Sequence, residues 1–257
     1  MFYLMLKLHK RNYFYLNNRN CENECLILTN KFSTITMNNN KYVIFDFDGT
    51  IANSIEQAIN TYNRIAHEYK CKPIREEFRD LLSSKNPQQY FKEYGITTFK
   101  LFLLVFRIRK EINKHISEIK PVKNILTSLY ELNNAGYKLG ILTSNSGKNV
   151  NQFLENNNLS GVFDFVYSAS NLFGKDKIFR RLLKRNNISI HNVIYVGDER
   201  RDAEASKKVG VPIIGVSWGL INRQVLETLQ IDQIADDPKE LLACVQNIFN
   251  NSATINS

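Results

Sequence analysis

The sequence predicts an α/β fold: a doubly wound parallel sheet with a small helical segment inserted after the first strand. Short runs rich in β-branched and aromatic residues alternate with segments of helical periodicity, which is typical of parallel sheets. A chain of 257 residues with 43% hydrophobic residues can bury one sizeable core and a smaller subdomain. The runs expected to form strands are residues 42–45, 138–143, 163–167, 193–197 and 212–216.

Helical periodicity follows the first strand and predicts the insert. Asn53 or Ser54 can cap a helix whose apolar residues recur on one face as far as Ala66. The sequence then stays helical, without strand alternation, to about residue 120, and residues 99–116 are expected to form a core helix with a basic, solvated end. The expected domains are an α/β core at residues 41–54 and 121–250, a helical cap at 55–120 and a tail at 251–257.

Prolines and a glycine mark two further helices. Pro121 is expected to open a helix, because its fixed φ suits the first helical turn, and Gly136 to close it. Pro238 in the same way precedes a last helix with apolar residues on one face. With these helices placed, the alternation of strand and helix extends to the end of the core.

The first 40 residues differ in composition from the rest. Residues 1–40 are rich in asparagine, lysine and aromatic residues without a clear period, so we expect a disordered or spurious extension. Met37, just before the first strand, is an alternative start. We do not expect a secretory signal, because the apolar piece 2–6 ends at a lysine, and an organellar leader in residues 1–36 is an alternative to the extension.

Composition restricts partners and compartment. With 34 Lys+Arg against 25 Asp+Glu, the net charge of +9 favours anionic partners. No basic run with interleaved aromatic residues indicates a specific nucleic-acid module, and the longest apolar run, residues 101–106, is too short to cross a membrane. Four cysteines form neither a disulfide framework nor a complete zinc set, so we expect a reducing, cytoplasmic location.

Two carboxylates follow the first expected strand. Asp46 and Asp48 stand at its carboxyl end, where ligands bind in open α/β sheets, and Gly49 and Thr50 come directly after them. A calcium loop of the EF-hand type is excluded by spacing, because Gln57 stands where that loop needs a glutamate. A capped turn without chemistry stays open for this stretch alone.

Three other strand ends carry polar groups in the same way. Thr143 and Ser144 follow one strand, and a lysine pair, Lys175 and Lys177, precedes a helix. The run from 197 to 202 carries further acids, among them Asp198 and Asp202. Parallel strands bring their carboxyl ends to one edge, so these groups are expected to meet.

These four motifs, in this order over residues 41–245, resemble the haloacid dehalogenase superfamily, and most closely its phosphoglycolate phosphatase-like members with a helical cap. The resemblance implies a Rossmann-like core and a phosphoric monoester hydrolase. Asp46, ionised near neutral pH, would attack phosphorus and form an aspartyl-phosphate. Asp48 would protonate the leaving oxygen and then activate water. Asp48 also argues against carbon–halogen cleavage, since the dehalogenases carry an aromatic residue there.

The resemblance also implies a metal and a phosphate site. Several carboxylates beside a phosphate require a cation, and hard oxygen ligands select Mg²⁺. The implied metal ligands are Asp46, the Asp48 carbonyl, Asp198 and Asp202. The implied phosphate contacts are Thr143, Ser144, Gly49 and Thr50, with a catalytic lysine to neutralise developing charge.

The chain departs from the family pattern at two points. The usual Lys-Pro is replaced by a lysine pair, of which Lys175 is the preferred catalytic residue and Lys177 the alternative. Asn53 replaces a frequent aspartate, which affects the expected hinge of the cap rather than the chemistry. The predicted substrate is a small phosphorylated metabolite. The alternatives are a phosphomutase or phosphonate-cleaving relative, and a non-catalytic interaction protein on the same fold.

Overall fold

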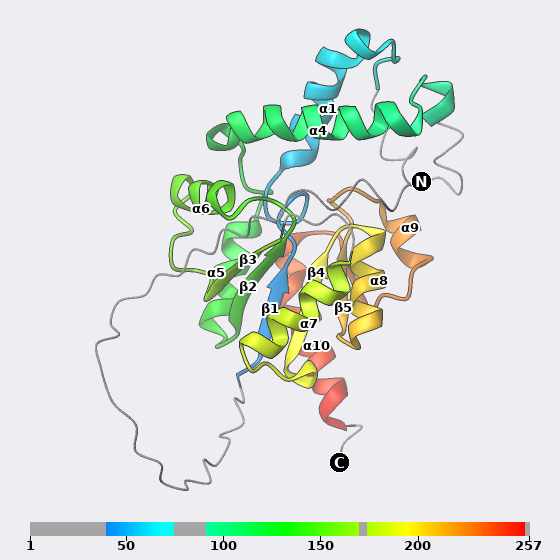
Figure 1. Ribbon diagram of the computed structural model, residues 1–257. Coiled ribbons are helices and arrows are strands. Elements are labelled where there is room, and N and C mark those ends of the chain that lie inside the picture. Colours follow the sequence, from blue (N-terminus) through cyan, green and yellow to red (C-terminus); the bar gives the residue numbers. More distant parts are fainter. Residues whose placement is uncertain (1–39, 75–90, 170–173, 255–257) are drawn as a thin grey trace, which may run out of the picture. The chain divides into compact units, whose positions relative to one another are not determined.

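The computed structural model describes residues 40–74, 91–169 and 174–254 (Figure 1). The strands are β1 (Tyr42–Phe45), β2 (Lys138–Thr143), β3 (Phe165–Ser168), β4 (Val193–Gly197), β5 (Ile213–Val216) and β6 (Gln233–Ala235). Within these described ranges they form one six-stranded parallel sheet, in the order β3-β2-β1-β4-β5-β6. The chain winds outward from β1 in one direction and from β4 in the other. The order therefore reverses between β1 and β4, which is where such sheets bind ligands.

Helices cover both faces of the sheet and also fill the connection between β1 and β2 (Figure 1). That connection holds α1 (Ser54–Ile65), η1 (Ala66–Tyr69), α4 (Thr98–Lys114), η2 (Ile116–Glu118) and α5 (Ile125–Asn134). The later elements are α6 (Gly147–Asn156), α7 (Lys175–Arg185), η3 (Ile190–Asn192), α8 (Arg200–Val209), α9 (Arg223–Glu227), η4 (Pro238–Glu240) and α10 (Leu241–Thr254).

The central strand β1 is packed on both faces. Val43 and Phe45 belong to a hydrophobic cluster with α5, α6 and α10, whereas Ile44 belongs to a second cluster with α7 and α8. Successive side chains of a strand point to opposite faces, so all three are completely buried. Burial of a side chain such as Phe45 stabilises the fold by about 1.5–3 kcal/mol. This packing fixes the end of β1, where Asp46 stands.

The insert has a small core of its own. Tyr62 and Ile65 of α1 pack with Leu104 of α4 in a separate hydrophobic cluster. Ile112 and Ile116, at the end of α4 and in η2, belong instead to the cluster around β1. No strand lies between β1 and β2 in the described part of this connection, in agreement with the predicted helical character. The limits 55–120 stay a prediction.

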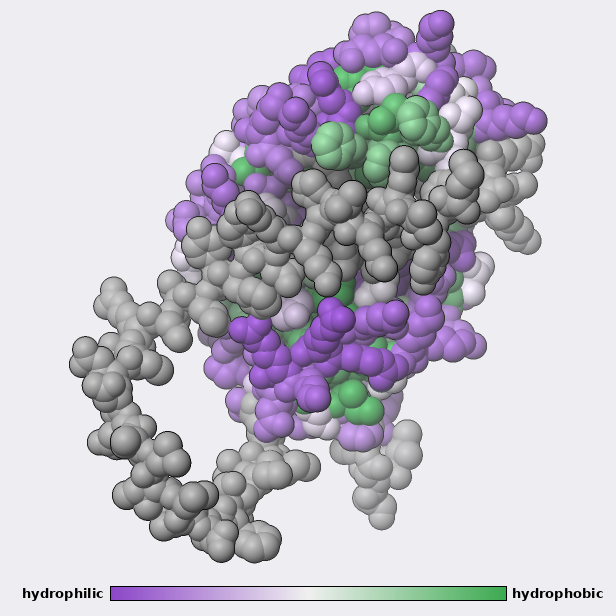
Figure 2. All heavy atoms as spheres, viewed as in Figure 1, coloured by the Kyte–Doolittle hydropathy of each residue, from purple (hydrophilic) through white to green (hydrophobic). Residues whose placement is uncertain are grey.

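The coloured part of the face shown in Figure 2 is mostly hydrophilic, with a hydrophobic patch toward the top, in the region of α4. Phe99, Phe102 and Phe106 lie on that helix and are between 65 and 71% exposed. The predicted helix at residues 99–116 is confirmed as far as Lys114, whereas the expectation that its first turns face the core is wrong for these three aromatic side chains. No helix in the described residues is long and apolar enough to cross a membrane.

The prediction that Pro121 opens a helix is wrong. Pro121 forms a short antiparallel bridge with Ala52, and the Val122 N–H donates to the Ile51 carbonyl at 2.9 Å. These bonds hold the segment extended against the loop that follows β1. The helix α5 starts only at Ile125, after Asn124 takes a left-handed conformation with φ of 69°.

The other strands and helices differ less from their predicted limits. The short strand β6 was not expected, because three residues carry too little pattern, and β3 starts at Phe165 rather than residue 163. Asn53 takes the N-cap position of α1 without a side-chain hydrogen bond. The last helix α10 continues to Thr254, into the expected tail. The prediction for residues 1–40 falls outside the described residues apart from residue 40.

Candidate active site

Asp46 is fixed at the switch point by backbone hydrogen bonds. Its N–H donates to the Val196 carbonyl of β4 at 2.8 Å, and its Oδ1 accepts the Phe47 N–H at 2.8 Å. The chain then turns, because the N–H groups of Ile51 and Ala52 both donate to the Phe47 carbonyl at 3.0 Å. The carboxylate of Asp46 is therefore placed by the sheet itself, with only 4% of the residue exposed.

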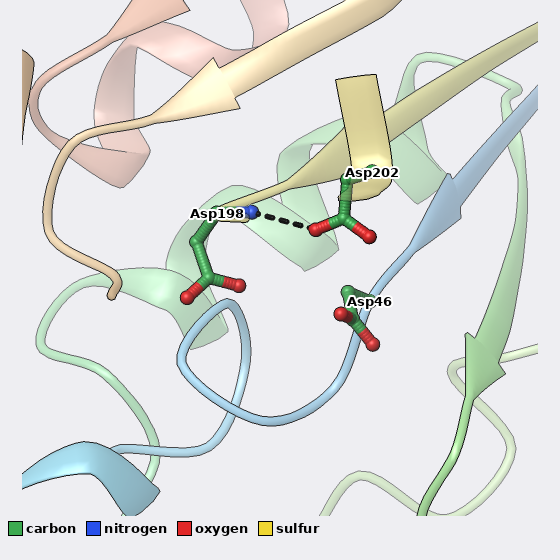
Figure 3. A group of neighbouring side chains, drawn as sticks. All are labelled: Asp46, Asp198 and Asp202. Atoms are coloured by element: carbon green, nitrogen blue, oxygen red, sulfur yellow. Dashed lines mark hydrogen bonds between the residues drawn. The ribbon is translucent and has the colours of Figure 1, made fainter. Parts of the chain in front are cut away.

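Three buried carboxylates converge at this point (Figure 3). Asp46 follows β1, Asp198 follows β4, and Asp202 lies in the first turn of α8. One oxygen from each lies within 4.8 Å of the others. Asp202 Oδ2 also accepts the N–H groups of Asp198 at 3.2 Å and Glu199 at 3.0 Å, which caps α8 and orients this carboxylate. The predicted convergence of these three aspartates is present in the structure.

Asp198 is held by contacts from two loops. Thr50 Oγ1 donates to its Oδ1 at 2.9 Å, and the Leu220 N–H donates to its Oδ2 at 2.7 Å. Thr50 is completely buried, and its hydroxyl thus orients an acid of the cluster. Its expected contact with phosphate stays a prediction. Gly49, with φ of 81°, passes so close that an added Cβ would lie 2.3 Å from Asp198 Oδ2.

Gly219 gives a test of this packing. A Cβ added there would lie 2.0 Å from Asp198 Cβ and 2.5 Å from its Oδ2, so Gly219→Ala must displace the carboxylate. We expect this variant to lose about 1–3 kcal/mol of unfolding free energy, as overpacked cores do, and most of its activity. Gly147→Ala is the control, since its Cβ would meet only Ser168 Cβ at 3.7 Å. Chemical denaturation measures the first effect, and phosphate release, the activity implied by the sequence motifs, measures the second. Equal behaviour of the two variants would contradict this account.

One lysine enters the cluster. Lys175 Nζ donates to Asp46 Oδ2 at 2.8 Å and also to Asp202 Oδ1, and the Lys175 side chain is 12% exposed. Burial lowers the pKa of this ammonium, but the neighbouring Asp202 and Asp46 outweigh that effect and raise the pKa well above its ordinary value. The lysine therefore stays charged. Lys177, the alternative, is exposed on α7, so the geometry favours Lys175.

The cluster holds more negative than positive charge. Burial raises the pKa of Asp198 well above its ordinary value, and repulsion from Asp46 and Glu199 adds to the effect. Burial likewise raises the pKa of Asp202, although Lys175 lowers it. Buried carboxylates with one ammonium among them are stabilised by a further cation. Carboxylate oxygens suit a hard divalent ion, so the donor set fits the Mg²⁺ expected from the sequence.

A small hollow, partly open to solvent, lies beside Lys175. Thr143 and Ser144, from the end of β2, line it, as does Arg201 of α8. Both expected phosphate contacts of the second motif are thus next to the expected lysine. Arg201 was not predicted. Its Nε and Nη2 donate to the Glu199 carboxylate at 2.5 and 3.0 Å, and a basic residue inside an acidic motif was the available signal.

Asp48 lies apart from the three clustered carboxylates. It is half-buried, and Asn145 Nδ2 donates to its Oδ1 at 3.3 Å and its Oδ2 at 3.1 Å. The two acids of the first motif therefore have different surroundings, as their predicted roles require. Asn145 was not predicted as a site residue. Its position two residues after Thr143 was the only signal.

Acids and a lysine therefore meet at the carboxyl edge of the parallel strands in this α/β fold. A profile of the haloacid dehalogenase-like hydrolases matches residues 43–216. The chain therefore belongs to the haloacid dehalogenase-like hydrolase family, as the sequence motifs predicted.

Relatives place the chain near the phosphatases of this family. A phosphoglycolate phosphatase of Synechococcus elongatus is 28% identical over 207 residues, which cover 80% of this chain and 98% of that protein. A pyrophosphatase PpaX of Bacillus mycoides is 24% identical over 210 residues, covering 80% and 97%. Among solved structures, a haloacid dehalogenase-like family hydrolase of Streptococcus pneumoniae shares the fold, with a TM-score of 0.66, 22% identity, and coverage of 80% and 99%.

Proposed function

We propose that the protein is a Mg²⁺-dependent phosphatase that hydrolyses a small phosphorylated metabolite through an aspartyl-phosphate at Asp46. The observation that carries this proposal is the pairing of buried Asp46 with Lys175, 2.8 Å apart, beside Asp198 and Asp202. A carboxylate held this way needs no general base to act as a nucleophile. The similarity to a phosphoglycolate phosphatase supports the same reaction class.

The first half of the reaction transfers the phosphoryl group to Asp46. An oxygen of the Asp46 carboxylate forms a bond to phosphorus while the bond from phosphorus to the leaving oxygen breaks. Asp48, in its protonated form, gives its proton to that leaving oxygen, so that an alcohol departs. Asp48 ends the step as a carboxylate, which Asn145 Nδ2 can stabilise by the hydrogen bonds described above.

The second half releases phosphate. Asp48, now a carboxylate, accepts a proton from a water molecule as the water oxygen attacks phosphorus. The bond between phosphorus and the Asp46 oxygen breaks, which returns Asp46 to its starting form and Asp48 to its protonated form. Asp48 thus serves as acid and then as base, and each cycle converts one phosphate ester and one water into an alcohol and phosphate.

The surrounding groups bind the charged phosphate. Lys175 supplies a fixed positive charge, while Thr143 and the backbone of Ser144 would hold phosphate oxygens at the hollow they line. Mg²⁺ held by Asp46, Asp198, Asp202 and the Asp48 carbonyl would neutralise charge on the phosphate as a Lewis acid. Thr50 and Leu220 keep Asp198 in place for that purpose.

A phosphoglycolate-like substrate is our first choice. The Synechococcus relative carries that name and aligns over 98% of its own length, whereas the Bacillus relative is named for pyrophosphate. Profiling phosphate release from a panel that contains phosphoglycolate, pyrophosphate and sugar phosphates distinguishes these substrates. Both relatives are less than 30% identical to this chain, and members of one fold act on different substrates. We expect residues of the insert to select the substrate.

Removal of the metal tests the proposal directly. We expect the protein to release phosphate from p-nitrophenyl phosphate with Mg²⁺ and to lose at least about a hundred-fold in rate in EDTA, because the unbalanced carboxylates then repel the substrate. Activity should return on adding Mg²⁺ in excess of the chelator. Equal rates with and without metal would contradict the metal site, and no release from any substrate of the panel would favour a non-catalytic protein.

A further inference from the structure

A chain of three asparagine side chains runs from Asp48 to the helical insert. Asn145 Nδ2 donates to the Asp48 carboxylate at 3.1 Å. Asn149 Nδ2, from α6, donates to Asn145 Oδ1 at 3.0 Å and to Asn113 Oδ1, from α4, at 2.6 Å. These hydrogen bonds therefore connect the loop after β1, the loop after β2, α6 and α4.

The amide of Asn145 can take only one orientation here. Its Oδ1 accepts two hydrogen bonds, from Asn149 Nδ2 and from the Ser146 N–H at 2.8 Å. A flipped amide would place its NH₂ group against these two donors and its oxygen against the Asp48 carboxylate. The main chain of Asn145 is fixed as well, since its N–H donates to Thr143 Oγ1 at 2.9 Å and its carbonyl accepts Ser168 Oγ at 2.5 Å.

Asn149 is the link that depends on the insert. It is only 8% exposed, and its NH₂ group donates to two amide oxygens, one on each side. A buried amide that loses one partner carries an unsatisfied donor, which is costly and is relieved by movement. Loss of the Asn113 acceptor would therefore loosen Asn149, and through it the bond that orients Asn145.

We propose that Asn145, Asn149 and Asn113 are positioning residues for Asp48, and that they make its proton transfer depend on the insert helix α4. This inference rests on the proposed role of Asp48 as general acid and base. None of the three needs to touch the reacting atoms. Asn145 holds the carboxyl group that gives the proton, Asn149 holds Asn145, and Asn113 carries the restraint from α4.

A comparison of two leaving groups tests the proposal. p-Nitrophenyl phosphate and phenyl phosphate are similar in shape, but phenolate is the poorer leaving group and needs the proton more. We therefore expect the ratio of kcat/KM for p-nitrophenyl phosphate to that for phenyl phosphate to rise by about ten-fold in Asn145→Ala, a loss typical of supporting hydrogen bonds. A rise of about three-fold is expected in Asn149→Leu, which removes the bonds to Asn145 and Asn113, and in Asn113→Ala, which removes the bond to Asn149, because Asn145 itself still contacts Asp48 in both variants.

Matched variants separate positioning from general damage. Asn113 is exposed, so its replacement leaves the core intact, and Asn113→Asp keeps the acceptor oxygen and should restore the wild-type ratio. Asn157→Ala is the control on α6, because it removes a bond of 2.8 Å to the Phe153 carbonyl at the far end of the helix. Its ratio should not change. A purely structural defect would lower kcat/KM for both substrates equally and leave the ratio unchanged.

The outcomes also distinguish this inference from the proposed function. Asp48→Asn should raise the ratio more than any asparagine variant. If it does, and the Asn145, Asn149 and Asn113 variants keep the wild-type ratio, the positioning chain is overturned while the phosphatase mechanism stands. If Asp48→Asn itself leaves the ratio unchanged, Asp48 is not the proton donor, and the inference fails together with that assignment. A raised ratio in Asn113→Ala that Asn113→Asp restores confirms the chain.

Discussion

Asp46→Asn should abolish turnover and leave the protein folded. The amide keeps the shape of the side chain and its bond to the Phe47 N–H but cannot form the acyl-phosphate. We expect kcat to fall by at least about a thousand-fold, as for other lost nucleophiles. The metal-free protein should stay folded, because loss of the ion pair with Lys175 is offset by relief of the repulsion that raises the pKa values of Asp198 and Asp202.

Phosphate release and thermal unfolding, measured on the same preparation, check this prediction. Asp236→Asn is a suitable control, since this acid pairs with Arg223 on the surface and should keep full activity when replaced. A wild-type rate of phosphate release in Asp46→Asn would contradict the proposed mechanism. Loss of activity together with loss of the folded state would instead show that Asp46 is needed for folding, against the expected relief of repulsion.

Asp48→Asn should have the second-largest effect on turnover, and it should slow hydrolysis of the phosphoenzyme more than its formation. The asparagine can still accept a hydrogen bond from Asn145, so the loop should keep its position. General acid and base catalysis is lost, which lowers rates by about 10²- to 10⁴-fold. Asp46 remains able to attack a substrate with a good leaving group, so phosphoenzyme forms and then hydrolyses slowly.

Rapid-quench kinetics with p-nitrophenyl phosphate separate formation of the phosphoenzyme from its hydrolysis. We expect a burst of p-nitrophenol close to one equivalent of enzyme, followed by slow steady turnover, because the second step lacks its base. A variant without any burst would show that Asp48 is already needed to form the intermediate from this substrate. Steady turnover at the wild-type rate would refute the assignment.

The position of the site could be read from the sequence because strands impose a simple geometry. The apolar run before Asp46 marks a buried strand, and parallel strands bring their carboxyl ends to one edge. Thr143, the last residue of β2, and Asp198, directly after β4, therefore had to lie at the same edge as Asp46. Lys175 was preferred over Lys177, and the structure places Lys175 Nζ 2.8 Å from Asp46 Oδ2.

What the sequence did not predict depends on contacts between distant residues. Thr50 and Asp198 are 148 positions apart, and nothing near either residue indicates that the hydroxyl donates to this carboxylate rather than to phosphate. Asn145 becomes a partner of Asp48 only when the loops after β1 and β2 meet. Pro121 looked like a helix start, but its segment is held extended by the loop around Ala52. In each case tertiary bonds outweigh the local signal.

The nature of the covalent intermediate tests the central claim most directly, namely that Asp46 attacks phosphorus while Asp48 moves the proton. Asp48→Asn protein is incubated with p-nitrophenyl phosphate and Mg²⁺, quenched in acid, digested and sequenced by mass spectrometry. The account predicts one phosphoryl group, on the side chain of Asp46, and none when Asp46 is also replaced by asparagine. A phosphoryl group on any other residue would contradict it, as would substrate turnover without labelled protein.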